Sequence, residues 1–252
     1  MLEESLVPLA LLALLLFSLE VGFRRGRRAA AEHDAATGSQ VGAIQGALLG
    51  LLGLLLAFSF AAAGSRFLER QDLIVEEANA IGTAFLRADL LAEPHRSELR
   101  QALERYTDHR IQLSASLQAG LPRDAQTEVD GLHARIWSAA SQGVAAQPEA
   151  MLAVLNPVNE VIDLHAIRLA AARKHLPGPV LGLLIVCSGL ALAVIGYGCG
   201  LGGRRRAPLS VPLALVAAAA LWITIDLDYP RRGLLQLSDA PLKALKLDAA
   251  RE

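Results

Sequence analysis

Four long apolar stretches alternate with polar segments along the chain. They cover Leu6–Phe23, Ile44–Ala63, Pro179–Leu201 and Leu209–Ile225. Each comes close to the roughly 20 mostly apolar residues that a helix needs to cross a bilayer core. Short linkers join the first stretch to the second and the third to the fourth, and a long charged region separates the two pairs. The pattern predicts an all-α integral membrane protein with four transmembrane helices in two hairpins.

The charged central region, residues 64–178, has helical periodicity. Apolar residues continue at steps of three, four and seven beyond the second apolar stretch, as in an amphipathic helix. We expect one continuous helix from Gly42 to Leu91, about 75 Å long, that projects from the membrane. Three more helices are predicted over His95–Leu117, Asp124–Val144 and Pro148–Leu176. Together these segments predict a helical bundle that extends from the second and third spans.

These elements suggest four parts of the chain. Residues 1–63 form the first transmembrane hairpin, 64–178 an extramembrane helical domain, and 179–225 the second hairpin. Residues 226–252 contain Pro230, which ends the last membrane helix, and the leucines after it predict an interfacial or docking segment. Pro157 is expected to kink the last central helix or to mark its start.

Composition supports a membrane protein and excludes several functions. Hydrophobic residues make up 53% of the 252 residues and charged residues 19%, with a mean hydropathy of +0.39. The formal net charge of −1 gives no reason to expect nucleic-acid binding. The two cysteines exclude a disulfide scaffold. No sequence motif for nucleotide binding, an activated serine or zinc-dependent hydrolysis is present, so we expect no enzymatic activity and neither a metal nor another cofactor.

Arginines in the two short linkers predict the orientation in the membrane. The linkers carry Arg24, Arg25, Arg27 and Arg28, and then Arg204, Arg205 and Arg206. Short loops rich in arginine stay in the cytoplasm, which places the central domain on the non-cytoplasmic side of a bacterial inner (plasma) membrane. A cleaved signal peptide is the alternative for the first span, but Glu3 and Glu4 stand where such a peptide carries basic residues.

One carboxylate, Glu20, falls near the end of the first span. A charge at this depth is costly unless it is paired or close to the interface. Arg24 follows one helical turn later and is the natural partner. The pair favours anchoring at the membrane surface over a role in proton transfer.

Small residues form seams on the second and third spans. Gly46, Gly50 and Gly53 lie on one face of the second span, and Gly189 and Gly196 are seven residues apart on the third. Small residues allow transmembrane helices to approach closely. We expect these glycines to pack helices, either within one subunit or between subunits.

Polar side chains form a candidate contact outside the membrane. Glu76 and Asn79 share a face of the long helix, and Asn159 and Asp163 share a face of the returning helix. Both pairs lie about 20–24 Å beyond the spans, so antiparallel packing predicts a buried polar or ion-binding contact. The alternative is a solvated face with ion pairs, for example between Glu76 or Glu77 and Arg168.

Several motifs are similar to those of a known family. They are EVGFR (20–24), LLGLLLAF (51–58), RFLE (66–69), VEEANAIGTAFLR (75–87), NEVIDLH (159–165) and IDLDYPRRG (225–233). In these motifs the chain resembles the bestrophin-like domain family, mostly bacterial membrane proteins that are distantly similar to bestrophins. Bestrophins are pentameric anion channels with a hydrophobic neck on the second transmembrane helix, and their soluble part is cytoplasmic. The resemblance implies a homo-oligomer in a lipid bilayer, with Leu55, Phe58 and Phe60 as pore-lining candidates.

Two functions are compatible with these features. The first is a homo-oligomeric ion channel with its pore along the second transmembrane helix. The second is a non-conducting membrane scaffold or sensor whose helical extramembrane domain binds a protein partner. An ion conductance would favour the first, and a partner that co-purifies in a fixed ratio would favour the second.

The orientation can be tested with a single cysteine at position 126 in the central region. If the linker arginines are cytoplasmic, Gln126→Cys reacts with a membrane-impermeant reagent added outside intact cells. Labelling that requires lysis would contradict this orientation and match the orientation that bestrophins have.

Overall fold

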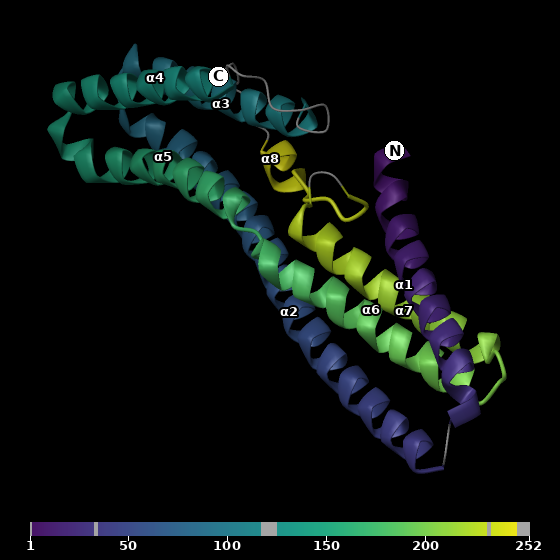
Figure 1. The fold of residues 1–252 in the computed structure, drawn as a ribbon. Helices are drawn as coiled ribbons and strands as arrows, with labels where there is room; N and C mark the ends of the chain where they lie inside the picture. Colours follow the sequence, from purple (N-terminus) through teal and green to yellow (C-terminus); the bar gives the residue numbers. More distant parts are fainter. Residues whose placement is uncertain (1, 33–34, 117–124, 231–232, 246–252) are drawn as a thin grey trace. The chain divides into compact units, whose positions relative to one another are not determined.

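The computed structural model describes residues 2–32, 35–116, 125–230 and 233–245, which form helices joined by turns and loops and contain no β-strand. The ends Leu117 and Asp124 that the sequence predicted for two helices lie outside these residues. The long helices, in chain order, are α1 (Leu2–Ala29), α2 (Ala35–Arg87), α3 (His95–Ser116), α4 (Ala125–Ala146), α5 (Met151–Arg173), α6 (Gly178–Leu201) and α7 (Ala207–Asp228) (Figure 1). Short helical turns are η1 (Ala30–Glu32), η2 (Ala88–Leu90), η3 (Pro148–Ala150) and the final helix α8 (Ala240–Ala244).

Four regions of the described chain are long and apolar enough to cross a membrane. They belong to α1, to the first part of α2, to α6 and to α7. In each region, between 17% and 33% of the most apolar 18-residue stretch is buried inside the chain. Most of their apolar side chains therefore face outward, as lipid-facing helices require. The predictions of an all-α fold and of four helices long and apolar enough to span a membrane are confirmed for the described residues.

The chain divides into two compact units. The first comprises Met1–Arg66 and His175–Leu235, and the second comprises Phe67–Lys174 and Gln236–Glu252. The C-terminal segment predicted at 226–252 is thus shared between the units, and its residues 246–252 lie outside the described residues.

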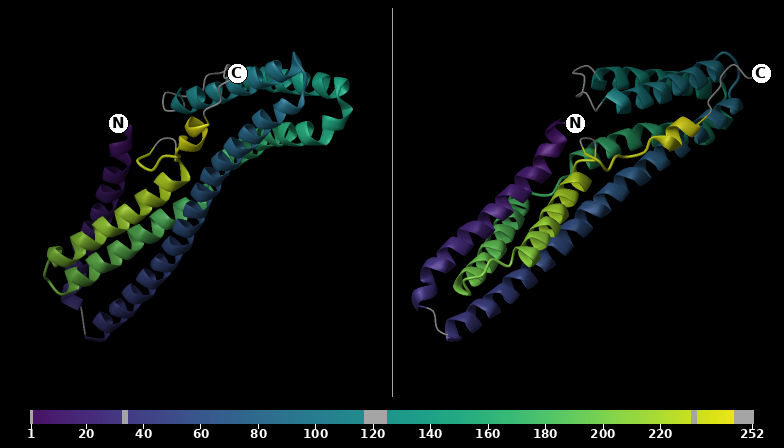
Figure 2. Two further views of the ribbon diagram at one scale, coloured as in Figure 1. Left: turned by 180° about the vertical axis from the view of Figure 1, so that it is seen from behind. Right: turned by 90° about the vertical axis from the view of Figure 1, so that its right-hand side faces the viewer.

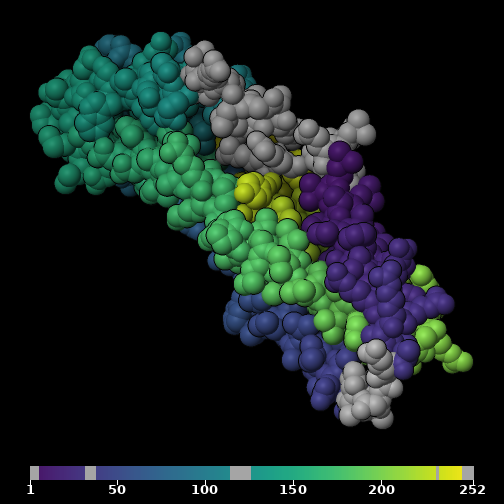
Figure 3. Space-filling model, viewed as in Figure 1, coloured from purple at the N-terminus to yellow at the C-terminus, as the bar shows by residue number. Residues whose placement is uncertain are grey.

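The closest helix packing in the first unit is between α1 and α6, which lie side by side in Figures 2 and 3. A Cβ atom at Gly22 would stand 1.9 Å from the carbonyl oxygen of Ala193, and one at Gly26 would stand 2.1 Å from that of Tyr197. On α6, a Cβ at Gly196 would stand 2.0 Å from the carbonyl oxygen of Leu19. Only glycine fits at these positions, because the two backbones are in direct contact.

Two buried aspartates hold the C-terminal end of α7 in the first unit. Asp228 is paired with Arg66 of α2 at 2.8 Å and accepts the backbone N–H of Leu176 at 2.7 Å. Asp226 accepts the backbone N–H groups of Leu234 and Leu235 at 3.0 and 2.8 Å. The carboxylates thereby satisfy backbone donors that no helix satisfies.

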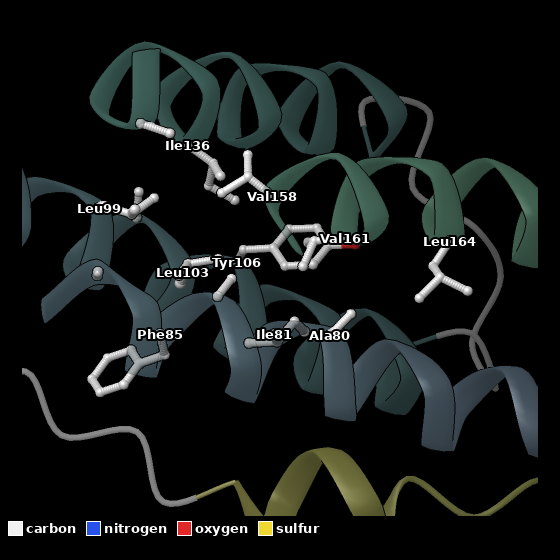
Figure 4. Close-up of a cluster of buried hydrophobic side chains, with 14 of the residues drawn as sticks. Ala80, Ile81, Phe85, Leu99, Leu103, Tyr106, Ile136, Val158, Val161 and Leu164 are labelled. Carbon is white, nitrogen blue, oxygen red and sulfur yellow. The ribbon is translucent and has the colours of Figure 1, made fainter. Parts of the chain in front are cut away.

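The second unit has its own hydrophobic core, built by α3, α4, α5 and the last part of α2. Its fully buried side chains include Ile81, Leu99, Leu103, Tyr106 and Ile136 (Figure 4). Leu242 of α8 joins this core, and Gln71 exchanges two hydrogen bonds with the backbone of Ser238. The chain from Gln236 onward therefore packs as part of the second unit. The interfacial or docking role predicted for residues 226–252 stays a prediction.

Pro157 lies inside α5 and does not mark its start, since the helix begins at Met151. Proline has no N–H to donate to the carbonyl four residues earlier, which here belongs to Ala153. The Arg87 guanidinium donates to that carbonyl oxygen at 3.1 Å. A side chain of α2 thus replaces the missing hydrogen bond, and the helix continues past the proline.

The contact between α1 and α6 predicts a large difference between two glycine substitutions. Gly22→Ala should destabilise the protein by about 1–3 kcal/mol, because the methyl group forces two backbones apart. Gly182→Ala is the matched control on α6, where a Cβ meets no atom of the described chain within 4 Å. Thermal unfolding of both variants in detergent micelles measures the difference, and equal midpoints would contradict the prediction.

Candidate functional site

The first half of α2 exposes most of its apolar surface. Phe58 is 67% exposed and Phe60 is 48% exposed, whereas Leu55 is half-buried against the hydrophobic cluster that α1, α6 and α7 build. Leu52 and Ser59 form the buried side of the helix. Of the three pore-lining candidates, the two phenylalanines are therefore open to lipid or to another subunit.

The two phenylalanines occupy different faces of α2. At 100° per residue, Phe58 and Phe60 are separated by about 200° around the helix axis. Leu51 and Leu54 share the face of Phe58 and are also exposed, whereas Phe60 lies beside the glycine seam. The two rings therefore cannot both face one surface that a single side of α2 provides.

The predicted glycine seams differ in what covers them. A Cβ at Gly46, Gly50 or Gly53 would meet no atom of the described chain within 4 Å. Packing of these three glycines within one chain, one of the two predicted alternatives, is therefore wrong. Gly189 approaches Ser18 of α1, with 3.3 Å from its hypothetical Cβ to the hydroxyl, and Gly196 contacts the α1 backbone. The α6 seam is used inside the subunit, and the α2 seam is left open.

Glu76, Asn79, Asn159 and Asp163 are all exposed side chains in the second unit. The buried contact that the sequence predicted among them is wrong for this chain. The reason is the rotational phase of α2, in which Ile74, Ala78 and Ile81 point into the core. This phase buries Glu77 and turns its neighbour Glu76, 100° away, toward solvent.

Glu77 is the centre of a buried polar network instead. Its side chain is 0% exposed, and it contacts groups from two other helices. The Tyr106 hydroxyl donates to Glu77 Oε1 at 2.6 Å, and Arg110 Nε donates to the same oxygen at 3.2 Å. Arg168 of α5 forms an ion pair with the other carboxylate oxygen. One carboxylate therefore links α2, α3 and α5 in the core of the second unit.

Two histidines extend this network toward α4. The His133 ring lies 5.1 Å from the rings of both Tyr106 and His165. Burial lowers the pKa of His165 to about 4, and the positive charge of Arg110 acts in the same direction. Burial also lowers the pKa of His133 and raises the pKa of Tyr106 to about 12. The histidines are thus neutral and the phenol protonated at neutral pH.

The sequence contained a signal for this network. Arg110 falls on the apolar side of its helix, in register with Leu103 and Tyr106. A basic residue in an apolar stripe requires a buried partner, and Glu77 interrupts the apolar stripe of α2 in the same way. The sequence suggests a solvated ion pair between Glu77 and Arg168 as one alternative. The structure contains this pair, but it lies in the protein core and not in solvent.

An ion pair of the first unit lies near the end of α1. Glu20 accepts a hydrogen bond from Arg24 Nε at 2.8 Å, which confirms the predicted pair. No group of three or more histidine, cysteine, aspartate or glutamate side chains arranged to hold a metal ion occurs among the described residues. The contacts around Glu77 hold three helices together.

Comparisons with known proteins agree on one fold. The family model described as a bestrophin-like domain matches residues 8–242. Two crystal structures of a bacterial bestrophin homologue from Klebsiella pneumoniae, each with one alanine substitution, match at TM-scores of 0.71 and 0.63. Both are 16% identical to this chain; the matches cover 94% and 90% of it and 93% and 94% of the respective homologue chains. No match was found among curated proteins.

Two neighbouring glutamates give a matched test of the network. Glu77→Gln should cost about 3–5 kcal/mol, because it leaves Arg110 and Arg168 buried without a counter-charge. Glu76→Gln removes the same charge from the exposed side of the same helix and should cost less than about 1 kcal/mol. Chemical unfolding in detergent measures both, and a Glu77→Gln cost as small as the control would show that the network contributes little.

Proposed function

Because the chain belongs to the bestrophin-like domain family, we propose that it is a homo-oligomeric ion channel of the bacterial inner membrane. In this proposal the four spans form two hairpins, and the helices between them form an extramembrane bundle. The pore runs along α2, and the leucine side of that helix, with Phe58, forms its constriction.

The observation that carries the proposal is the uncovered seam of α2. Gly46, Gly50 and Gly53 leave room for another helix, yet a Cβ on any of them meets no atom of the described chain within 4 Å. In lipid, close packing across small residues is what drives helices to associate. A second copy of the chain is the simplest partner for this seam.

The chemistry of the neighbouring face suits a narrow pore. Leu51, Leu54 and Phe58 project from one side of α2, and none of them is covered by the described chain. If glycine seams bring the α2 helices of several subunits together, these side chains converge on a common axis. An apolar constriction of this kind gates ions by excluding water.

The linker arginines support an orientation with the extramembrane bundle outside the cytoplasm. This side of the membrane is opposite to that of the bestrophin soluble part. It forms a separate part of the proposal, because conductance and orientation are measured independently.

Reconstitution of the purified protein in planar bilayers tests conduction. We expect an ion current that Phe58→Ala increases about twofold or more, because a smaller side chain admits water to an apolar constriction. Phe17→Ala is the matched control, since Phe17 is 66% exposed on α1 and lies outside the proposed pore.

Two results would contradict the channel. The first is the absence of current from a protein that is folded and oligomeric. The second is a current that Phe58→Ala and Phe17→Ala alter equally. A protein partner that co-purifies with the non-conducting chain would instead support the scaffold or sensor function.

A further inference from the structure

The strongest charged surface of the first unit lies where α1 ends and α6 passes into α7. Residues 20–32 and 196–210 together carry seven arginines and two carboxylates, Glu20 and Glu32. The arginines are Arg24, Arg25, Arg27, Arg28, Arg204, Arg205 and Arg206, and all seven are exposed. We call these seven residues the arginine patch.

The two halves of the patch are held together by backbone packing. A Cβ at Gly200 would stand 2.7 Å from the backbone nitrogen of Arg27. A Cβ at Gly26 would stand 2.1 Å from the backbone carbonyl oxygen of Tyr197. The end of α1 and the linker that follows α6 therefore lie at the same end of the first unit, as Figure 1 shows. Charges 180 residues apart in the sequence form one surface.

Glu20 fixes two of the guanidinium groups across this junction. It accepts hydrogen bonds from Arg205 Nη1 at 2.8 Å and Nη2 at 3.1 Å, and from Arg24 Nε at 2.8 Å. The Arg205 guanidinium also lies over the Phe23 ring, 4.5 Å from its centroid. The side chains of Arg24 and Arg205 nevertheless remain 71% and 62% exposed. They are oriented by the protein and still open to a ligand.

We propose that the arginine patch binds the headgroups of anionic phospholipids. The patch begins directly where the apolar surfaces of α1 and α6 end, which is the depth of the lipid phosphates. Guanidinium groups match phosphate oxygens with paired hydrogen bonds. Glu20 acts as a positioning residue that holds Arg24 and Arg205 in place for this contact.

The experiment compares the lipids retained by the full-length protein. The protein is reconstituted in vesicles of equal amounts of phosphatidylglycerol and phosphatidylcholine, extracted in mild detergent, and analysed by native mass spectrometry. We expect phosphatidylglycerol to be enriched about threefold or more among the retained lipids. Equal retention of the two lipids would overturn the proposal.

Two double variants test whether the patch is responsible. Arg204→Gln with Arg206→Gln leaves the Glu20–Arg205 contact intact, removes two of the seven charges of the patch and should lower the enrichment. Arg105→Gln with Arg135→Gln removes the same charge from exposed positions of the second unit and should leave the enrichment unchanged. Equal losses in both variants would mean that net charge alone selects the lipid, which overturns the proposal.

Glu20→Gln separates a positioned site from diffuse attraction. The substitution makes the patch more positive, so diffuse attraction predicts equal or greater enrichment of phosphatidylglycerol. The positioned site predicts lower enrichment at an unchanged helix content by circular dichroism. If this variant does not fold, the double variants still decide the proposal.

A competition experiment shows whether the patch binds lipid phosphate or free phosphate. Inorganic phosphate presents the same oxygens without acyl chains, and it should not displace the retained phosphatidylglycerol. Displacement would show that the patch binds soluble anions and would overturn its assignment to the membrane.

Discussion

The helices of the first unit must associate without a hydrophobic driving force, because lipid is as apolar as their side chains. Apolar side chains gain little by leaving lipid for protein, so close backbone approach must supply the attraction. Gly22 and Gly26 of α1 meet α6 in this way, and Gly196 makes the reciprocal contact. Once α1 and α6 are in register, the carboxylate of Glu20 reaches Arg205. The arrangement of charge at the end of the spans thus follows from where glycines occur.

The second unit follows the opposite rule, because burial there removes apolar surface from water. Four helices close around aliphatic side chains, and this core also holds a fully buried carboxylate, Glu77. Such a group is stable only when its partners are complete, which Arg110, Arg168 and Tyr106 provide. α2 contributes to both units, so a single helix satisfies two different packing rules along its length.

The fold was predictable to the extent that it depends on hydropathy. The four spans, the long second helix and the α4 and α5 segments follow from blocks and periods of apolar residues. The close contacts of Gly22 and Gly26 were not predictable, because a glycine shows its use only when its partner backbone is known. We predicted Glu76 in the buried contact from the sequence, whereas the structure buries its neighbour Glu77. Adjacent residues of a helix point about 100° apart, and two consecutive glutamates do not show which of them faces the core. The sequence left two alternatives for the α2 seam, and the structure shows that no described atom of the same chain covers its glycines. Its use between subunits stays a prediction.

The Glu77 network also constrains how sequences of this kind can change. Loss of the carboxylate leaves two buried cations, and loss of one arginine leaves the other cation to balance the carboxylate alone. Loss of the carboxylate is therefore expected to destabilise the protein more than loss of either arginine. The three positions on α2, α3 and α5 are expected to evolve as one unit, with replacement of all three by apolar residues as the alternative that preserves the core.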